Sequence, residues 1–204
     1  MKKLVQGGVK KFSDLRCYLK SDAKYYKKQV GFFSRIVNSL VTNPINTQKY
    51  IFKYVVNLRK SEFHLNNSIL CNEFSIVSMA HTIFLIFYYW RLRVYGNKTG
   101  FQIPPNVCGP GLRIFHYGWI VINEKARIGE NLTIYPGVVI GHKSSEGGAP
   151  CIGNNCFIGA GAKIFGSIHI GNNVTIAPNS VVTKDVPDNS VVGGIPFRII
   201  KMKK

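Results

Sequence analysis

The segment CIGNNCFIGAGAKIFGSIHIGNNVTIAPNSVVTKDVP (residues 151–187) carries an aliphatic residue at every sixth position. The spacing extends back to Ile122 and misses only Glu146, after which it resumes in phase. The aliphatic positions are Ile122, Ile128, Ile134, Ile140, Ile152, Ile158, Ile164, Ile170, Ile176 and Val182. A period of six fits neither an α-helix nor an isolated strand. It is typical of a parallel β-solenoid, in which successive coils stack their aliphatic side chains into one core.

A second set of positions supports the same interpretation. The residue four places after each aliphatic position is mostly small or aliphatic, as at Ala126, Val138, Cys156, Ala162, Val174 and Ser180. Side chains of this size suit the inner side of a narrow coil. We therefore predict that Cys156 is a packing residue and that the sequence from residue 101 onward is mainly β.

Three stretches resemble the hexapeptide-repeat acyltransferases: IGENLTIYPGVVIG (residues 128–141), residues 151–187, and GGIPFRI (residues 193–199). The resemblance is greatest to the serine-acetyltransferase-like branch, which includes bacterial capsule and exopolysaccharide O-acetyltransferases. It implies a left-handed parallel β-helix with triangular coils, acetyl-CoA as the donor, and a homotrimer or a multiple of it. It covers about residues 101–198, roughly half of the chain.

The composition divides the chain in two. Of its 204 residues 46% are apolar, which is enough for a core. We predict a basic, helical N-terminal extension over residues 1–100 and a hexapeptide-repeat β-helix acyltransferase domain with a short tail over residues 101–204. No apolar stretch follows the basic start MKKLVQGGVKK, and the five cysteines lack metal-ligand spacing. We therefore expect a cytoplasmic protein with reduced thiols and no metal.

The formal charge of +18 is unevenly distributed. Residues 1–100 hold 17 Lys and Arg against 4 Asp and Glu, or +13, whereas residues 101–204 hold 10 against 5, or +5. Such a field attracts anionic partners. Anionic lipid headgroups, and hence peripheral membrane association, or an acidic polymer fit this charge, with simple solubility as the alternative. Nucleic acid is disfavoured because no nucleic-acid-binding motif accompanies the charge.

Three helices are predicted in the extension. Apolar residues at helical spacing cover Phe32–Leu40, before Asn43-Pro44, and again Tyr50–Leu58. A third element, capped by Asn67-Ser68, has a core without charge over Phe74–Trp90, and residues 96–100 form the turn into the first coil. This core is either a buried helix that covers the end of the solenoid, a membrane-surface element, or a membrane span.

Transfer of an acetyl group to a hydroxyl requires a base that works near pH 7, and histidine suits that task. Of five histidines, His116 lies in GLRIFHYGWIVIN (residues 111–123), which resembles the family segment that bears the catalytic histidine. The alternative is a packed or surface histidine at a coil corner. Its second ring nitrogen needs an acceptor, for which Asp22, Glu124, Glu146 and a backbone carbonyl are candidates.

The interruption of the repeat predicts a second part of the site. Lys143–Pro150 forms a loop where the family places its substrate loop, and His142 at its mouth is a second candidate catalytic residue. The resemblance assigns Ala160, Pro178, Thr183 and Lys184 to a groove for the pantetheine arm of acetyl-CoA between subunits, and Lys201 to the nucleotide phosphates. His169 is expected to be a surface residue.

Two departures from the serine acetyltransferases bear on the acceptor. Phe115 stands where those enzymes have an aspartate, and Ala149 where their substrate loop has a histidine. We therefore predict direct acetyl transfer to a sugar hydroxyl of a capsule, O-antigen or exopolysaccharide, flanked by Phe115, Tyr117 and Trp119. The enzymatic alternative is serine or another small molecule. The alternative of another class is a non-catalytic β-helix scaffold or binding module.

Overall fold

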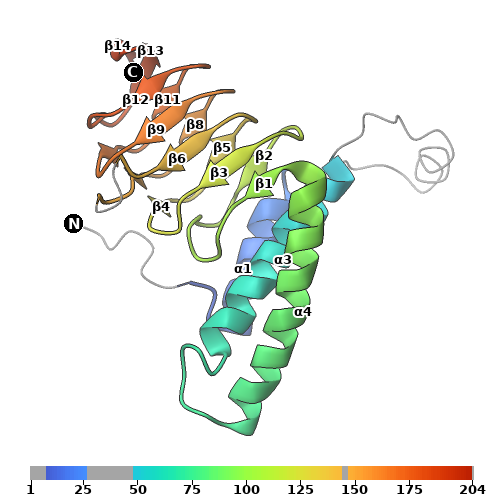
Figure 1. The fold of residues 1–204 in the computed structure, drawn as a ribbon. Helices are drawn as coiled ribbons and strands as arrows, with labels where there is room; N and C mark the ends of the chain where they lie inside the picture. Colours follow the sequence, from blue (N-terminus) through green and yellow to red (C-terminus); the bar gives the residue numbers. More distant parts are fainter. Residues whose placement is uncertain (1–7, 27–47, 144–146, 204) are drawn as a thin grey trace, which may run out of the picture.

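The computed structural model describes residues 8–26, 48–143 and 147–203 (Figure 1). Its helices are α1 (Phe12–Ala23), α3 (Gln48–Asn67) and α4 (Ile76–Thr99). Its strands are β1 (Phe101–Gln102), β2 (Arg113–Ile114), β3 (Ile120–Ile122), β4 (Arg127–Ile128), β5 (Thr133–Ile134), β6 (Val139–Gly141), β7 (Cys151–Ile152), β8 (Phe157–Ile158), β9 (Lys163–Phe165), β10 (His169–Ile170), β11 (Thr175–Ile176), β12 (Val181–Val182), β13 (Ser190–Gly194) and β14 (Phe197–Met202).

The strands form three sheets, and each coil adds one strand to each sheet in turn. Sheet A has the order β1-β3-β6-β9-β12, sheet B the order β10-β7-β4, and sheet C the order β14-β13-β11-β8-β5-β2. Neighbouring strands pair in parallel, except that β14 turns back antiparallel to β13. Figure 1 shows the coils as a stack that ends at β13 and β14. The predicted left-handed parallel β-helix of hexapeptide coils with a helical N-terminal part is confirmed.

The six-residue repeat forms the core as predicted. In sheet A Ile122 pairs with Ile140, Ile140 with Ile164, and Ile164 with Val182. The ten repeat positions are all at most 3% exposed, and the small residues four places later, Cys156 included, are equally buried. Ile140 and Ile152 both keep their places in the ladders, so the interruption between them does not shift the register.

Asparagines shape the corner between sheets B and C. Asn131, Asn155, Asn173 and Asn189 all have φ between 56° and 57°, a left-handed conformation that asparagine tolerates better than most residues. Their amides also bond across coils, from Asn131 Nδ2 to Asn155 Oδ1 at 3.1 Å and from Asn173 Nδ2 to Asn189 Oδ1 at 2.8 Å. The corner residues therefore add polar ladders to the apolar ladders of the core.

The helix that covers the end of the solenoid is α3, not the segment predicted for this role. Ile51, Tyr54, Val55 and Leu58 of α3 are at most 1% exposed and join the solenoid core. The predicted Tyr50–Leu58 helix is thus confirmed. α4 packs along α3 and buries only Ser78, Leu85 and Thr99, so of the three alternatives for Phe74–Trp90 the buried helix that covers the solenoid is wrong. Within the described residues, no helix is long and apolar enough to cross a membrane.

The bounds of α4 also differ from the prediction. Its N-cap is Ser75, whose hydroxyl accepts a hydrogen bond from the Ser78 amide at 3.0 Å, whereas Asn67 is the last residue of α3. Residues 96–99 belong to α4, and only Gly100, with φ 82°, makes the turn into β1. On this basis we propose the domain boundary at residue 100. The predicted helix over Phe32–Leu40 lies outside the described residues.

A buried ion network joins the helices to the first coil. The Arg59 guanidinium of α3 is fully buried and donates to Asp22 of α1 at 2.8 Å and to Glu62 at 3.0 Å. It also donates to the backbone carbonyls of Cys108 at 2.8 Å and Gly109 at 2.7 Å. Burial by itself would lower the pKa of Arg59, but the two carboxylates outweigh it and raise this pKa.

The two carboxylates of the network extend it along the first coil. Asp22 Oδ1 accepts from the amides of Gly111 at 2.7 Å and Leu112 at 2.8 Å. Glu62 Oε1 accepts from the amide of Asn106 at 3.0 Å. Each buried charge therefore has both an opposite charge and backbone partners, which is the condition under which buried ion pairs are tolerated.

Candidate functional site

Except for Lys201 in β14, the predicted site residues lie on two edges of the β-helix that flank sheet A. The first edge consists of the turns that lead from sheet C into sheet A: residues 115–119, 135–138, 159–162 and 177–180. The second edge consists of the turns after sheet A: residues 123–126, 141–143, 147–150, 165–168 and 183–186. The register of β2, β5, β8 and β11 aligns His116, Ala160 and Pro178 along the first edge. His142, Thr183 and Lys184 lie on the second edge.

His116 is exposed at the N-terminal end of the first edge. Its neighbours are aromatic: the Phe115 and Tyr135 rings stack with centroids 4.5 Å apart, and the His116 ring lies 6.3 Å from that of Tyr135. Arg113 lies over Phe115 at 4.2 Å. The His116 imidazole makes no hydrogen bond with the described part of the chain, so both of its ring nitrogens are accessible to a ligand.

The structure corrects one candidate for the acceptor that orients His116. Both oxygens of Asp22 are occupied by Arg59 and by backbone amides, and the carboxylate is fully buried. Asp22 therefore docks α1 and does not orient His116. Glu124 is exposed on the second edge, across sheet A from His116, and Glu146 lies outside the described residues.

His142 lies at the mouth of the predicted loop and is exposed. Its Nδ1 is 2.9 Å from Nδ2 of Asn123, in the neighbouring turn of the second edge. Since β3 and β6 run parallel, His116 comes before sheet A and His142 after it. One chain therefore does not bring the two histidines together. A site that uses both edges requires a second copy of the chain.

The three aromatic residues predicted to flank a sugar have different surroundings. Phe115 is half-buried in its stack with Tyr135, and Tyr117 is half-buried with its ring 6.4 Å from that of Tyr50. Burial raises the pKa of Tyr117, with a smaller effect from Tyr50. Trp119 is 78% exposed. These side chains do not pack on one another, and only Trp119 stands free for a ligand.

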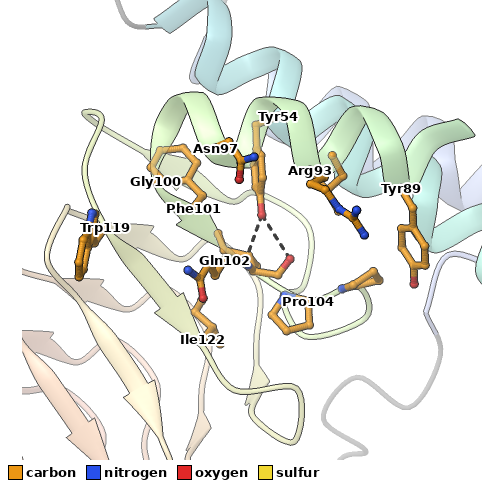
Figure 2. Close-up of a pocket in the computed structure, with 14 residues that line it drawn as sticks. Tyr54, Tyr89, Arg93, Asn97, Gly100, Phe101, Gln102, Pro104, Trp119 and Ile122 are labelled. Carbon is orange, nitrogen blue, oxygen red and sulfur yellow. Dashed lines mark hydrogen bonds between the residues drawn. The ribbon is translucent and has the colours of Figure 1, made fainter. Parts of the chain in front are cut away.

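Trp119 lines a groove of about 730 Å³ between α4 and the first coil. Figure 2 shows Trp119 at one end, Tyr89 and Arg93 at the other, and the amides of Asn97 and Gln102 between them. Arg93 is the only charged residue of the lining, so the groove is neutral to cationic. No sequence motif marks this groove, because α4 and the first coil form its walls together and only the folded chain brings them side by side.

The floor of the groove is fixed by a buried tyrosine. Tyr54 of α3 is 1% exposed, and its hydroxyl donates to the carbonyl of Ile103 at 3.3 Å and accepts from the amide of Ile103 at 3.1 Å (Figure 2). The Tyr54 ring also packs edge-on against Phe101 at 5.2 Å. The first coil and the helices thus hold the groove in one shape.

The residues assigned to acetyl-CoA are accessible. Ala160, Pro178, Thr183, Lys184 and Lys201 are all exposed, and the Asn179 amide donates to the Ala160 carbonyl at 2.8 Å. A Cβ added at Gly159 would lie 2.6 Å from the Pro178 nitrogen, so the first edge stays narrow. Small residues along an exposed edge and lysines at Lys184 and Lys201 fit a slender thioester arm with an anionic end.

Comparisons with known proteins show that the repeat is similar to acetyltransferases. The family model described as bacterial transferase hexapeptide (six repeats) matches residues 152–184. The serine acetyltransferase of Staphylococcus aureus (strain Mu50) is 47% identical over 106 residues, 50% of this chain and 50% of its own length. That of Synechococcus elongatus is 44% identical over 105 residues, 50% of this chain and 43% of its own. The chain thus spans about half the length of the curated relatives it matches.

Solved structures extend the similarity to the helices. The serine acetyltransferase from Brucella abortus strain S19 superposes with a TM-score of 0.62 at 26% identity, over 91% of this chain and 68% of that one. A structure of that enzyme with coenzyme A gives 0.61 at 25% identity, over 95% and 70%. The serine acetyltransferase from Neisseria gonorrhoeae gives 0.63 at 25%, over 94% and 67%. In its repeat sequence and in its whole fold, this chain is similar to serine acetyltransferases.

Proposed function

We propose that this protein is an acetyl-CoA-dependent O-acetyltransferase. The observation that carries the proposal is the first edge, where an exposed histidine, His116, is aligned with the small-residue turn at Ala160. The similarity to serine acetyltransferases, one of them solved with coenzyme A, supports acetyl-CoA as the donor. A non-catalytic scaffold would have no need of an exposed histidine aligned with such a turn.

In the proposed reaction His116 acts as the general base. It removes the proton of the acceptor hydroxyl, the oxygen attacks the thioester carbonyl, and the C–S bond breaks to release the thiol of coenzyme A, which takes up the proton. Backbone amides of the edge stabilise the oxyanion. Cys108 and Cys156 are buried, and burial raises the pKa of Cys108 to about 12. Neither suits a covalent intermediate, which favours direct transfer.

The proposed enzyme is a cyclic homotrimer or a multiple of it. The first edge carries His116 and the second carries His142, and sheet A separates them within one chain. A cyclic arrangement repeats one interface and closes on itself, so the first edge of each subunit meets the second edge of its neighbour. Thr183 and Lys184 of the neighbour then complete the groove for acetyl-CoA. A monomer that remains active at micromolar concentration contradicts this arrangement.

For the acceptor we propose a small hydroxyl compound of the serine type. The relatives favour this alternative over the predicted polysaccharide, and no comparison supports the capsule or exopolysaccharide branch. One observation favours a saccharide as the second candidate. Phe115 is held in an aromatic stack, and Trp119 lines a groove whose one charged residue is Arg93. These aromatic faces suit a sugar ring, whereas an amino acid needs partners of both charges.

A thiol-release assay separates these candidates. Wild-type protein is tested with L-serine, simple sugars, nucleotide sugars and acidic polymers. Release with serine alone supports the first candidate, release with saccharides alone supports the second, and release with none favours the scaffold. With the active acceptor, His116→Ala should lower turnover by about 10²- to 10⁴-fold. His169→Ala, at an exposed strand position, is the control. A His116→Ala variant that retains more than a tenth of the activity contradicts the role of His116.

We also propose that the enzyme works in the cytoplasm at the inner face of the membrane. The excess of +13 in residues 1–100 supports this location, because the inner leaflet of bacterial membranes is rich in anionic lipid.

A further inference from the structure

The side of α4 that faces away from α3 is exposed to solvent, where a polar surface is expected, but it is apolar. Between Ile76 and Trp90 the helix has no charged residue, and its exposed side chains follow helical spacing. They are Ile76, Val77, Met79, Ile83, Phe84, Ile86, Phe87 and Trp90, each 43–80% exposed, and they form what we call the α4 outer face. The buried Leu85 marks the opposite side, which packs on α3. A contiguous apolar surface of this kind indicates a binding partner.

A row of basic residues borders this face. We call it the basic seam: Lys53 and Lys60 of α3 with Arg91 and Lys98 of α4. Each lies 5.2–5.9 Å from the centre of one or two aromatic rings of the same two helices. The ion pairs found in the described part of the chain all involve Arg59, so the seam carries four cations without a carboxylate partner there. The Arg91 guanidinium lies 5.6 Å from the centre of the Phe87 ring. Because Phe87 belongs to the outer face, the basic seam and the outer face are in contact.

The combination selects one occupant. Apolar side chains beside cations match the boundary of an anionic bilayer, where acyl chains accept the former and phosphates the latter. Aromatic rings next to Arg and Lys are favoured at the same depth. A second copy that paired its own outer face with this one would bring its basic seam close to this seam, and like charges disfavour that contact. A soluble acidic polymer satisfies the seam but leaves the outer face in water.

We infer that the α4 outer face and the basic seam together dock the protein on the surface of an anionic lipid bilayer. This inference deepens the proposed membrane location by naming the surface that provides it. Arg91 and Arg93 are two residues apart and thus lie on different sides of α4. The seam and the groove of Trp119 therefore flank the outer face from opposite sides. Docking in this way leaves the groove open beside the membrane.

Cosedimentation with vesicles tests the inference on the full chain. Vesicles of phosphatidylglycerol and phosphatidylcholine should bind the protein, and vesicles of phosphatidylcholine alone should not. Ile83→Asp should weaken binding to the anionic vesicles by more than about tenfold, since it puts a carboxylate into the interface. Ile199→Asp, on the exposed side of β14 at the other end of the solenoid, is its matched control and should bind as the wild type does.

The charge contribution has its own matched pair. Lys53→Gln with Lys98→Gln should weaken binding by about fivefold for each lysine. Lys10→Gln with Lys20→Gln removes the same net charge from exposed positions in and next to α1 and should have at most a small effect. Equal losses for both pairs would mean that only the overall field acts, and would overturn the inference.

Three further results would also overturn it: no binding to anionic vesicles, equal binding to neutral vesicles, or a smaller oligomer for Ile83→Asp in light scattering, which would make the outer face a subunit interface. Thiol release with a soluble acceptor is measured on the same protein preparations in the absence of vesicles. A variant that loses vesicle binding but keeps this activity shows a defect in the docking surface alone. Loss of activity in every variant would instead count against the proposed function.

Discussion

The solenoid and the helical extension are stabilised in different ways. In the solenoid each coil contacts only its neighbours, and identical ladders of aliphatic side chains and asparagine amides repeat along the stack. The extension has no such repetition. It is attached through the apolar side chains of α3 that enter the solenoid core and through one fully buried network around Arg59, which joins α1, α3 and the first coil. Charged and polar contacts are therefore repeated along the stack in one region and concentrated around one residue in the other.

Breaking the concentrated point should have the largest effect on stability. In Arg59→Met the side chain keeps much of its volume, but Asp22 and Glu62 remain buried without a counter-charge, so we expect a loss of about 3–5 kcal/mol in the free energy of unfolding. The two tryptophans report the two regions separately, Trp90 in α4 and Trp119 at the first coil. In denaturant titrations of single-tryptophan variants, the Trp90 signal should shift at least as far as that of Trp119.

A matched substitution controls for the loss of a guanidinium. Arg93→Met, at an exposed position of α4, should change stability by less than about 0.5 kcal/mol. A loss below about 1 kcal/mol for Arg59→Met would show that the network contributes little and that the apolar contacts of α3 hold the helices in place.

Core truncation in the solenoid should have an effect of similar or smaller size, and this effect should depend little on which ladder is changed. Ile140→Ala in sheet A and Ile158→Ala in sheet C remove equivalent, almost fully buried side chains, and each should cost about 2–5 kcal/mol. Thermal denaturation of both variants, with the exposed Ile199→Ala as control, measures this. Costs that differ by more than about twofold between the ladders would contradict the equivalence of the coils.

The smallest expected effect concerns the contact between α3 and α4. His64 Nδ1 lies 3.0 Å from His81 Nδ1, and burial, then His81 and Lys60, lower the pKa of His64 to about 4. The group is neutral in the folded state, so the stability it contributes is complete above about pH 6.5 and is lost as the pH falls toward 4.

His64→Gln should therefore flatten the dependence of the melting temperature on pH between 6.5 and 4. His169→Gln, in exposed strand β10, should leave this dependence unchanged. An identical slope in the wild type and in His64→Gln would mean that protonation of His64 does not act on the helix pair.

Several features could be predicted from the sequence because they depend only on the spacing of nearby residues. Ile152 and Cys156 are buried where the repeat predicts, and Tyr50–Leu58 is helical as its apolar spacing indicates. The caps of α4 could not be located in this way, because both Asn67-Ser68 and Ser75 are plausible N-caps and only the packing against α3 distinguishes them. Asp22 was a wrong candidate for the acceptor beside His116 for a similar reason, since its partner Arg59 is 37 residues away.

The solenoid follows from the amino-acid sequence alone, because a six-residue repeat leaves each coil one way to bury its aliphatic side chain. The sequence also determines the order of the edges on which His116, Ala160 and His142 lie, since the register follows from the repeat. That α3 covers the solenoid and that α4 exposes its apolar side could be seen only in the folded chain. Both segments are apolar at helical spacing, and the contacts that distinguish them, such as those of Arg59 with Asp22 and with the Cys108 carbonyl, join distant segments that no local pattern encodes.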